Sequence, residues 1–177
     1  MEKTLERLLS NRFNPDYDSS NKISDSPGIY VICLKSGCYL PEVSVKPELK
    51  QFDGLEVIYV GISSKSLRGR DYRQHFNGNN AGRSTLRKSL GILHGFQQVP
   101  RDKDPNTGKT KFADADEIKL SEWMRNNLVM YSLATAEYGK LEEDLIRYFN
   151  PPLNLKGNYS VINKDFRSLV SQLRSNK

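Results

Sequence analysis

Two short strings constrain the fold of this chain more than any other feature. Residues 28–30 read Gly-Ile-Tyr and residues 59–61 read Tyr-Val-Gly. Each string lies in a run of β-branched and aromatic residues that is bounded by turn-forming or charged residues, which is typical of a β-strand. The two runs, 28–33 and 57–62, therefore predict two strands.

Side-chain alternation along these strands places the two tyrosines. Tyr30 shares a face with Ile32, and Tyr59 shares a face with Val57 and Gly61. If the strands pair antiparallel, the two phenols point the same way as cross-strand neighbours. Two phenols on one face, with basic residues just after the second strand, are suited to the floor of an active site.

Hydrophobic spacing predicts the elements around these strands. Residues 128–133 read as a third strand, and residues 137–149 as a helix that Pro151 ends. Amphipathic helices are expected over residues 1–12 and 164–174. We predict one α+β domain over residues 1–177, with a core at about 27–154 and a central antiparallel sheet of about three strands flanked by helices.

Composition narrows the classes of function. The chain has 177 residues and a net charge of +6, which favours a polyanionic partner. Two cysteines, Cys33 and Cys38, are too few for a disulfide framework or a zinc site. No apolar run is long enough to cross a bilayer, and the charged start of the chain does not resemble a signal peptide. We expect a cytoplasmic protein without a membrane partner.

The adjacent residues Glu142 and Glu143 differ in their helical neighbours. On the predicted helix, Glu142 has apolar or aromatic neighbours, whereas Glu143 faces Arg147 and solvent. A carboxylate on the core side is costly without a partner. Either Mg²⁺ or an arginine can supply that partner, and periodicity alone does not choose between them.

The two strings and a set of residues after them resemble the GIY-YIG nuclease family. In order, the set is residues 67–70 (Leu-Arg-Gly-Arg), His75, residues 141–142 (Leu-Glu) and residues 151–154 (Pro-Pro-Leu-Asn). This order is similar to the family's layout of two strands, an arginine helix, a glutamate helix and an asparagine. The resemblance covers about residues 27–154 and implies an endonuclease that hydrolyses phosphodiester bonds.

The resemblance also implies roles for the charged residues. Glu142 would hold one divalent ion, Mg²⁺ or Mn²⁺, in each active site. Arg70 would stabilise the charge that develops on the phosphoryl oxygens. The spacing around Arg70 is one residue longer than expected on both sides, so Arg68 and Arg73 remain alternatives.

The remaining family positions are two tyrosines, a histidine and an asparagine. One of Tyr30 and Tyr59 would be the general base and the other would orient water or phosphate, and we favour Tyr30 as the base. His75 would relay a proton or donate a hydrogen bond to a phosphate. Asn154 would support the site through hydrogen bonds to the backbone or to catalytic groups.

Basic residues near the arginine helix are candidates for phosphate contacts. Residues 83–90 read as a short helix with Leu86 and Leu90 inward and Arg83, Arg87 and Lys88 outward. The full set of candidate nucleic-acid contacts is Lys65, Arg68, Arg73, Arg83, Arg87 and Lys88.

These observations predict a metal-dependent DNA endonuclease, with a sequence-specific, restriction-like enzyme as one form. Its substrate would be duplex DNA, and a homodimer is one way for a single-site subunit to cut both strands. The alternatives are a nucleic-acid-binding module without catalysis, an RNA-directed nuclease, and a repair or mobile-element nuclease.

Overall fold

The computed structural model describes residues 1–175, and its centre is a five-stranded antiparallel sheet with the order β1-β7-β2-β4-β3. Three long strands form its middle: β2 (Gly28–Leu34), β4 (Leu55–Ser63) and β7 (Leu128–Ala134). The edges are the two-residue strands β1 (Arg12–Phe13) and β3 (Gln51–Phe52). The predicted fold class is confirmed, and the two short edge strands raise the strand count above the expected three.

Helices and a small second sheet surround the central sheet. The α-helices are α1 (Glu2–Leu9), α2 (Thr85–Leu93), α3 (Asp114–Asn127), α4 (Tyr138–Phe149) and α5 (Lys164–Ser175). The segment η2 (Arg68–Phe76) is a π-helix, and η1 (Ser20–Lys22), η3 (Ala81–Arg83) and η4 (Pro105–Thr107) are 3₁₀ turns. A hairpin of β5 (Gln98–Pro100) and β6 (Thr110–Phe112) forms the second sheet. None of the helices described is long and apolar enough to cross a membrane.

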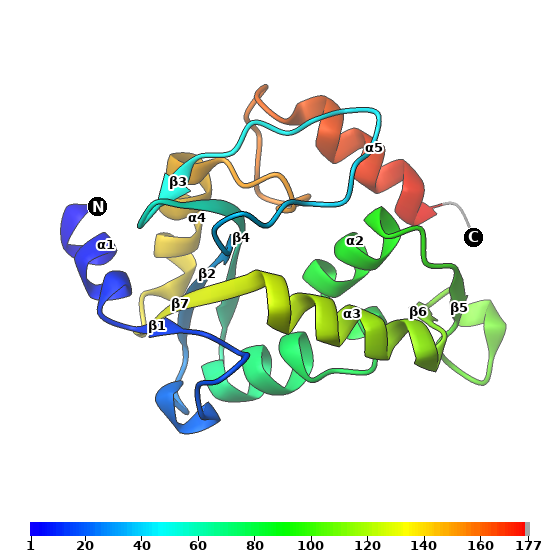
Figure 1. Ribbon diagram of the computed structural model, residues 1–177, viewed down its shortest axis with the longest axis horizontal. Coiled ribbons are helices and arrows are strands. Elements are labelled where there is room, and N and C mark those ends of the chain that lie inside the picture. The colour runs from blue at the N-terminus through cyan, green and yellow to red at the C-terminus, as the bar shows by residue number, and fades with distance from the viewer. Residues whose placement is uncertain (176–177) are drawn as a thin grey trace.

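The sheet has helices on both faces. Figure 1 shows α1 and α4 on one side of the long strands and α2 and α3 on the other. Accordingly, every residue of β2 is buried, and alternate β2 residues pack into two separate apolar clusters. The continuous apolar run in β2 reflects this burial on both faces.

A bulge in β4 changes one predicted face. The pairing skips a residue, so that Ile32 lies opposite Tyr59 while Cys33 lies opposite Val57. Ile58 is the extra residue, and it packs in the same cluster as Tyr59, whereas Val57 packs on the opposite face. The expectation that Val57 shares a face with Tyr59 is therefore wrong. The tyrosine face itself is unaffected.

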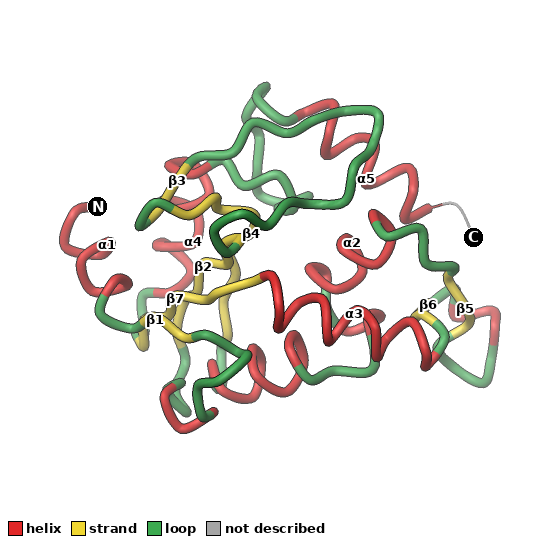
Figure 2. Tube along the Cα trace, viewed as in Figure 1, coloured by secondary structure: helices red, strands yellow, loops and turns green. Residues whose placement is uncertain are grey.

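The C-terminal helix is held over α2 by a long loop. Figure 2 shows residues 35–50 as a loop that runs from β2 toward α5 before the chain returns to β3. Asn163, just before α5, accepts a hydrogen bond from Glu48 N at 2.7 Å and donates one to Glu48 O at 2.8 Å. Phe166 and Val170 of α5 are buried in the same apolar cluster as Tyr59. This packing brings the C-terminal helix to the tyrosine face of the sheet.

Candidate active site

The two tyrosines lie on one face of the sheet, as expected. Tyr30 lies opposite Gly61 and Tyr59 lies opposite Ile32, so the phenols are diagonal neighbours with ring centroids 6.2 Å apart. A β-carbon at Gly61 would collide with the Tyr30 hydroxyl and lie 2.8 Å from Cε1 of Tyr59. Only glycine at this position lets the Tyr30 ring lie directly over the backbone of β4.

A buried chain of hydrogen bonds extends from Tyr30. Its hydroxyl is 2.8 Å from His75 Nε2, and His75 Nδ1 is 2.7 Å from Ser84 Oγ. Burial, followed by the charges of Arg70 and Arg87, holds the pKa of His75 well below its usual value. The imidazole is therefore neutral near pH 7, with one ring nitrogen as donor and the other as acceptor. Because His75 is fully buried, it reaches solvent or a phosphate only through other groups.

Tyr59 and Glu142 line the same open cleft. This Glu142 cleft has a volume of about 600 Å³ and is also lined by Lys88, Asn154, Lys156 and Arg174. Tyr59 is 8% exposed, whereas Tyr30 is fully buried. Tyr59 is therefore the phenol that borders the cleft. Tyr30 lies beneath the surface, beside the Tyr59 ring.

Glu142 lines this cleft, and no other described residue pairs with its carboxylate. Within residues 1–175, its carboxylate makes no hydrogen bond or ion pair with another side chain. Burial, followed by the negative charge of Glu143, raises the pKa of Glu142. Glu143 is exposed, so the predicted difference between the two carboxylates is confirmed in their burial.

Asn154 holds the second tyrosine string in place. Its Nδ2 donates to Val60 O and its Oδ1 accepts from Val60 N, each at 2.8 Å. Leu153 N also donates to Ile58 O at 3.1 Å. The Asn154 side chain and the Leu153 backbone thus bond β4 on the two sides of Tyr59. Asn154 was expected to bond either the backbone or catalytic groups, and its side chain bonds the backbone of Val60.

The arginines of η2 lie outside the Glu142 cleft. Arg70 lines a neighbouring cleft of about 550 Å³ with Lys65 and Arg73, and its Nη1 donates to Gln74 Oε1 at 2.7 Å. Arg68 instead donates from Nε to the backbone oxygen of Ile23 at 3.0 Å, which ties η2 to the loop before β2. Of the two, Arg70 is the one whose charge reaches His75.

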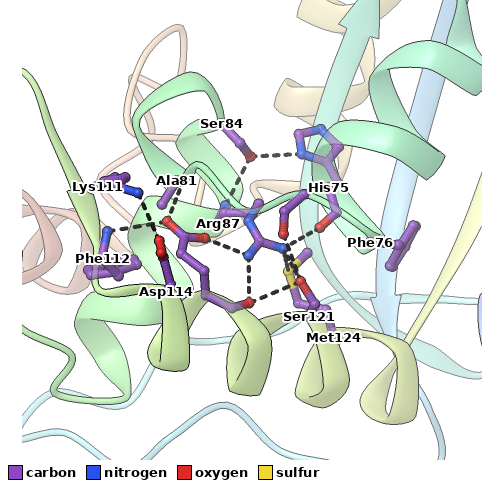
Figure 3. Close-up of polar contacts among 12 residues, drawn as sticks. His75, Phe76, Ala81, Ser84, Arg87, Lys111, Phe112, Asp114, Ser121 and Met124 are labelled. Atoms are coloured by element: carbon purple, nitrogen blue, oxygen red, sulfur yellow. Dashed lines mark hydrogen bonds and ion pairs between the residues drawn. The ribbon is translucent and has the colours of Figure 1, made fainter. Parts of the chain in front are cut away.

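Arg87 is buried, so its predicted outward position is wrong. Figure 3 shows its guanidinium among buried groups of η2 and α3. It donates to His75 O, Ser121 Oγ and both the backbone and carboxylate oxygens of Glu117, with an ion-pair distance of 2.6 Å. Leu86 and Leu90 predicted one buried face for this helix. Because α2 packs against both α3 and α5, more of the surface of α2 is covered. Arg87 cannot contact a nucleic acid in this structure.

The other basic residues of this region have separate positions. Arg83 is exposed, and Lys65 and Arg73 are exposed beside Arg70. Lys88 reaches the Glu142 cleft, where its Nζ donates to Thr110 Oγ1 at 2.6 Å.

Two basic residues of the Glu142 cleft were missed by the sequence reasoning. Arg174 comes from α5 and Lys156 from the loop before it. The spacing of Phe166 and Val170 predicted a packed C-terminal helix, but nothing in the sequence showed which cleft that helix would border.

Comparison with known proteins agrees with the resemblance. The family model for the GIY-YIG catalytic domain matches residues 28–176. No curated protein and no solved structure gives a significant match to the chain.

Proposed function

Because the chain belongs to the GIY-YIG catalytic domain family, we propose that it is a metal-dependent endonuclease that hydrolyses phosphodiester bonds of DNA. The family is one of nucleases, so the substrate is a nucleic acid. DNA as the substrate and a metal ion as the cofactor are parts of the proposal. It rests on one observation: the phenol of Tyr59 lines the same open cleft as the carboxylate of Glu142, which has no side-chain partner within residues 1–175.

The residues present fit a single divalent ion. No group of three or more acidic, histidine or cysteine side chains that could hold a metal occurs in the described residues, so a cage made only of protein is not formed there. Mg²⁺ commonly binds through one or two carboxylates together with water and substrate phosphate oxygens. Glu142 is suited to this role because it is half-buried and has no ion-pair partner among the described residues. When bound, Mg²⁺ or Mn²⁺ would polarise the phosphate and stabilise the leaving 3′ oxygen.

The two tyrosines are suited to moving the proton of the attacking water. Sequence reasoning favoured Tyr30 as the base, but the greater exposure of Tyr59 favours Tyr59 as the phenol that meets water. In this assignment the phenolate form of Tyr59 accepts a proton from water as the water oxygen bonds to phosphorus. The bond between phosphorus and the 3′ oxygen breaks, and the leaving 3′ oxygen takes a proton from solvent. Tyr30 and neutral His75 hold the adjacent hydrogen-bond chain in place.

Positive charge around the clefts supports binding of a polyanion. The Arg70 cleft, formed with Lys65 and Arg73, lies next to the end of β4. Arg70 would contact the substrate phosphates there, since a guanidinium keeps its charge and matches phosphate geometry. Sequence-specific, restriction-like cutting and a homodimer on DNA are further parts of the proposal that this arrangement permits.

A cleavage assay tests the proposal. Purified protein is incubated with supercoiled plasmid, a linear DNA duplex and a matched RNA duplex, each with Mg²⁺, Mn²⁺ or EDTA. We expect metal-dependent cutting of DNA that Glu142→Gln reduces by at least about 100-fold. Glu143→Gln is the matched control, because it removes the adjacent exposed carboxylate and should keep near wild-type activity at neutral pH.

The other outcomes identify the alternatives. Cutting of the RNA duplex alone would indicate an RNA-directed nuclease. Salt-sensitive binding without cutting under any metal condition would indicate a binding module. Equal activity of Glu142→Gln and the wild type would contradict the role of Glu142, and discrete DNA fragments would support sequence specificity.

A further inference from the structure

The Glu142 cleft contains an arginine that belongs to none of the family strings. Arg174 lies in the last turn of α5, and it lines the cleft together with Tyr59 of β4 and Asn154 of the loop after α4. Arg70, the arginine expected at the site, lines the neighbouring cleft instead. We propose that Arg174 binds a phosphate of the nucleic-acid strand in the Glu142 cleft, so that the C-terminal helix is part of the substrate-binding surface.

The backbone of Arg174 is fixed by a hydrogen bond, whereas its guanidinium makes few polar contacts with the described residues. The backbone is fixed by Gln98 Nε2, which donates to Arg174 O at 3.0 Å. The side chain makes one long hydrogen bond, from Nη1 to Ser89 Oγ at 3.4 Å. Across residues 1–175 it forms no ion pair with a carboxylate. A guanidinium carries five N–H donors, so most of its capacity remains available to an anion.

Burial makes an anionic ligand more favourable at this position. Desolvation lowers the pKa of Arg174, and the nearby Tyr59 partly opposes that effect. A half-buried charge of this kind is stabilised by an opposite charge, and a phosphate accepts paired hydrogen bonds from a guanidinium. Among the described lining residues, Arg174, Lys88 and Lys156 are cationic and Glu142 is the one acid, so these side chains together carry net positive charge. A phosphodiester carries a negative charge and accepts paired hydrogen bonds, so it suits this position.

A purely structural role for Arg174 is the competing explanation. In that case the side chain would serve to fasten α5 to α2 through Ser89. The length of that hydrogen bond, 3.4 Å, gives it little weight. The apolar contacts of Phe166 and Val170 already attach α5 to the domain.

The salt dependence of binding separates the two roles. The affinity of the full-length protein for a fluorescent DNA duplex is measured in EDTA, which prevents cutting, over a range of salt concentrations. Log affinity falls as log salt concentration rises, and each lost phosphate contact makes this fall less steep by about 0.9. We expect Arg174→Gln to lower the slope by about this amount and to weaken binding about tenfold near physiological salt.

Two further variants control the measurement. Arg147→Gln also removes one positive charge, but Arg147 lies outside the cleft and is 78% exposed beside Asp144, so the slope should stay near that of the wild type. Arg174→Lys keeps the charge and should restore most of the slope. Thermal unfolding of all variants should be close to that of the wild type.

The inference rests on the proposed function, and the outcomes distinguish their failures. If the wild type binds and cuts DNA and Arg174→Gln keeps the wild-type slope, the inference is overturned while the nuclease proposal stands. If Arg174→Gln lowers the melting temperature but leaves the slope unchanged, the role is structural and the inference is also overturned. If the wild type neither binds nor cuts nucleic acid, both fail.

Discussion

Two groups of charged side chains lie within the same domain and differ in how they are paired. Arg87 and Glu117 are fully buried, 2.6 Å apart, and bonded to the surrounding backbone and to Ser121. Glu142 and Arg174 are half-buried in an open cleft, and the described part of the chain gives neither an ion-pair partner. The first pair is bonded within the protein, whereas we propose that the second pair binds ligands, a metal ion at Glu142 and a phosphate at Arg174.

The difference separates charges that connect parts of the fold from charges that we propose bind a ligand. Glu117 Oε1 also accepts from Ala81 N and Phe112 N, so one carboxylate connects η3, β6 and α2. Because Arg87 and Glu117 are both fully buried, a ligand cannot reach either charge. A charge that is both buried and partnerless is costly to the fold, so we expect it to have a function.

Breaking the paired cluster should have the largest effect. Arg87→Met leaves Glu117 buried without its partner and should lower the free energy of unfolding by about 3–5 kcal/mol. Urea denaturation of the variant and the wild type measures the change. The double variant Arg87→Met with Glu117→Met should recover part of the loss. A loss below about 1 kcal/mol would show that the cluster is not structural.

The side chain that links the start of α2 to His75 should have the next largest effect. Ser84 Oγ accepts from Arg87 N as the N-cap of α2 and bonds His75 Nδ1 at 2.7 Å. Ser84→Ala removes both contacts and should cost about 1–3 kcal/mol in unfolding free energy, with a lower cleavage rate. Ser84→Thr keeps the hydroxyl and should retain more of both. Equal cleavage rates for Ser84→Ala and the wild type would show that the hydrogen bond between Ser84 and His75 does not contribute to catalysis.

Replacement by glutamine should change the free energy of unfolding in opposite directions at Glu117 and Glu142. Glu117→Gln should destabilise the protein, whereas Glu142→Gln should stabilise it by less than about 1 kcal/mol while abolishing cleavage. The pKa of Glu142 is raised in the folded state, so its ionised form opposes folding at neutral pH. The stabilisation should therefore disappear below the pKa of an unfolded glutamate. Urea denaturation at neutral and acidic pH checks both points, and destabilisation by Glu142→Gln would contradict the assignment.

The smallest effect should be a shift of the pH profile. Glu143 contributes to the raised pKa of Glu142, so Glu143→Gln should lower that pKa and keep Glu142 ionised to lower pH. The acidic limb of kcat/KM should move to lower pH by a fraction of a unit. Asp144→Asn is the control, because Asp144 faces Arg147 and does not contribute to the pKa of Glu142. An unmoved acidic limb would show that another group controls it.

Local pattern predicted much of this molecule. The runs around Tyr30 and Tyr59 predicted two paired strands, and helical spacing placed Glu142 on the half-buried side of α4 and Glu143 in solvent. Both predictions depend only on near neighbours in the chain. The bulge at Ile58 was not predicted, because one extra residue in a strand is specified by its pairing partner rather than by its own sequence.

The sequence by itself determined the family, the order of the elements and the residues able to do nuclease chemistry. Only the tertiary structure decided which of those charges face inward and which face a cleft. Arg87 and Arg174 look alike in a sequence, since both lie on amphipathic helices near apolar residues. Their environments differ because α2 is covered by α3 and α5, while the last turn of α5 ends beside Tyr59. Contacts between segments far apart in the chain therefore bury one charge with a partner and leave the other available.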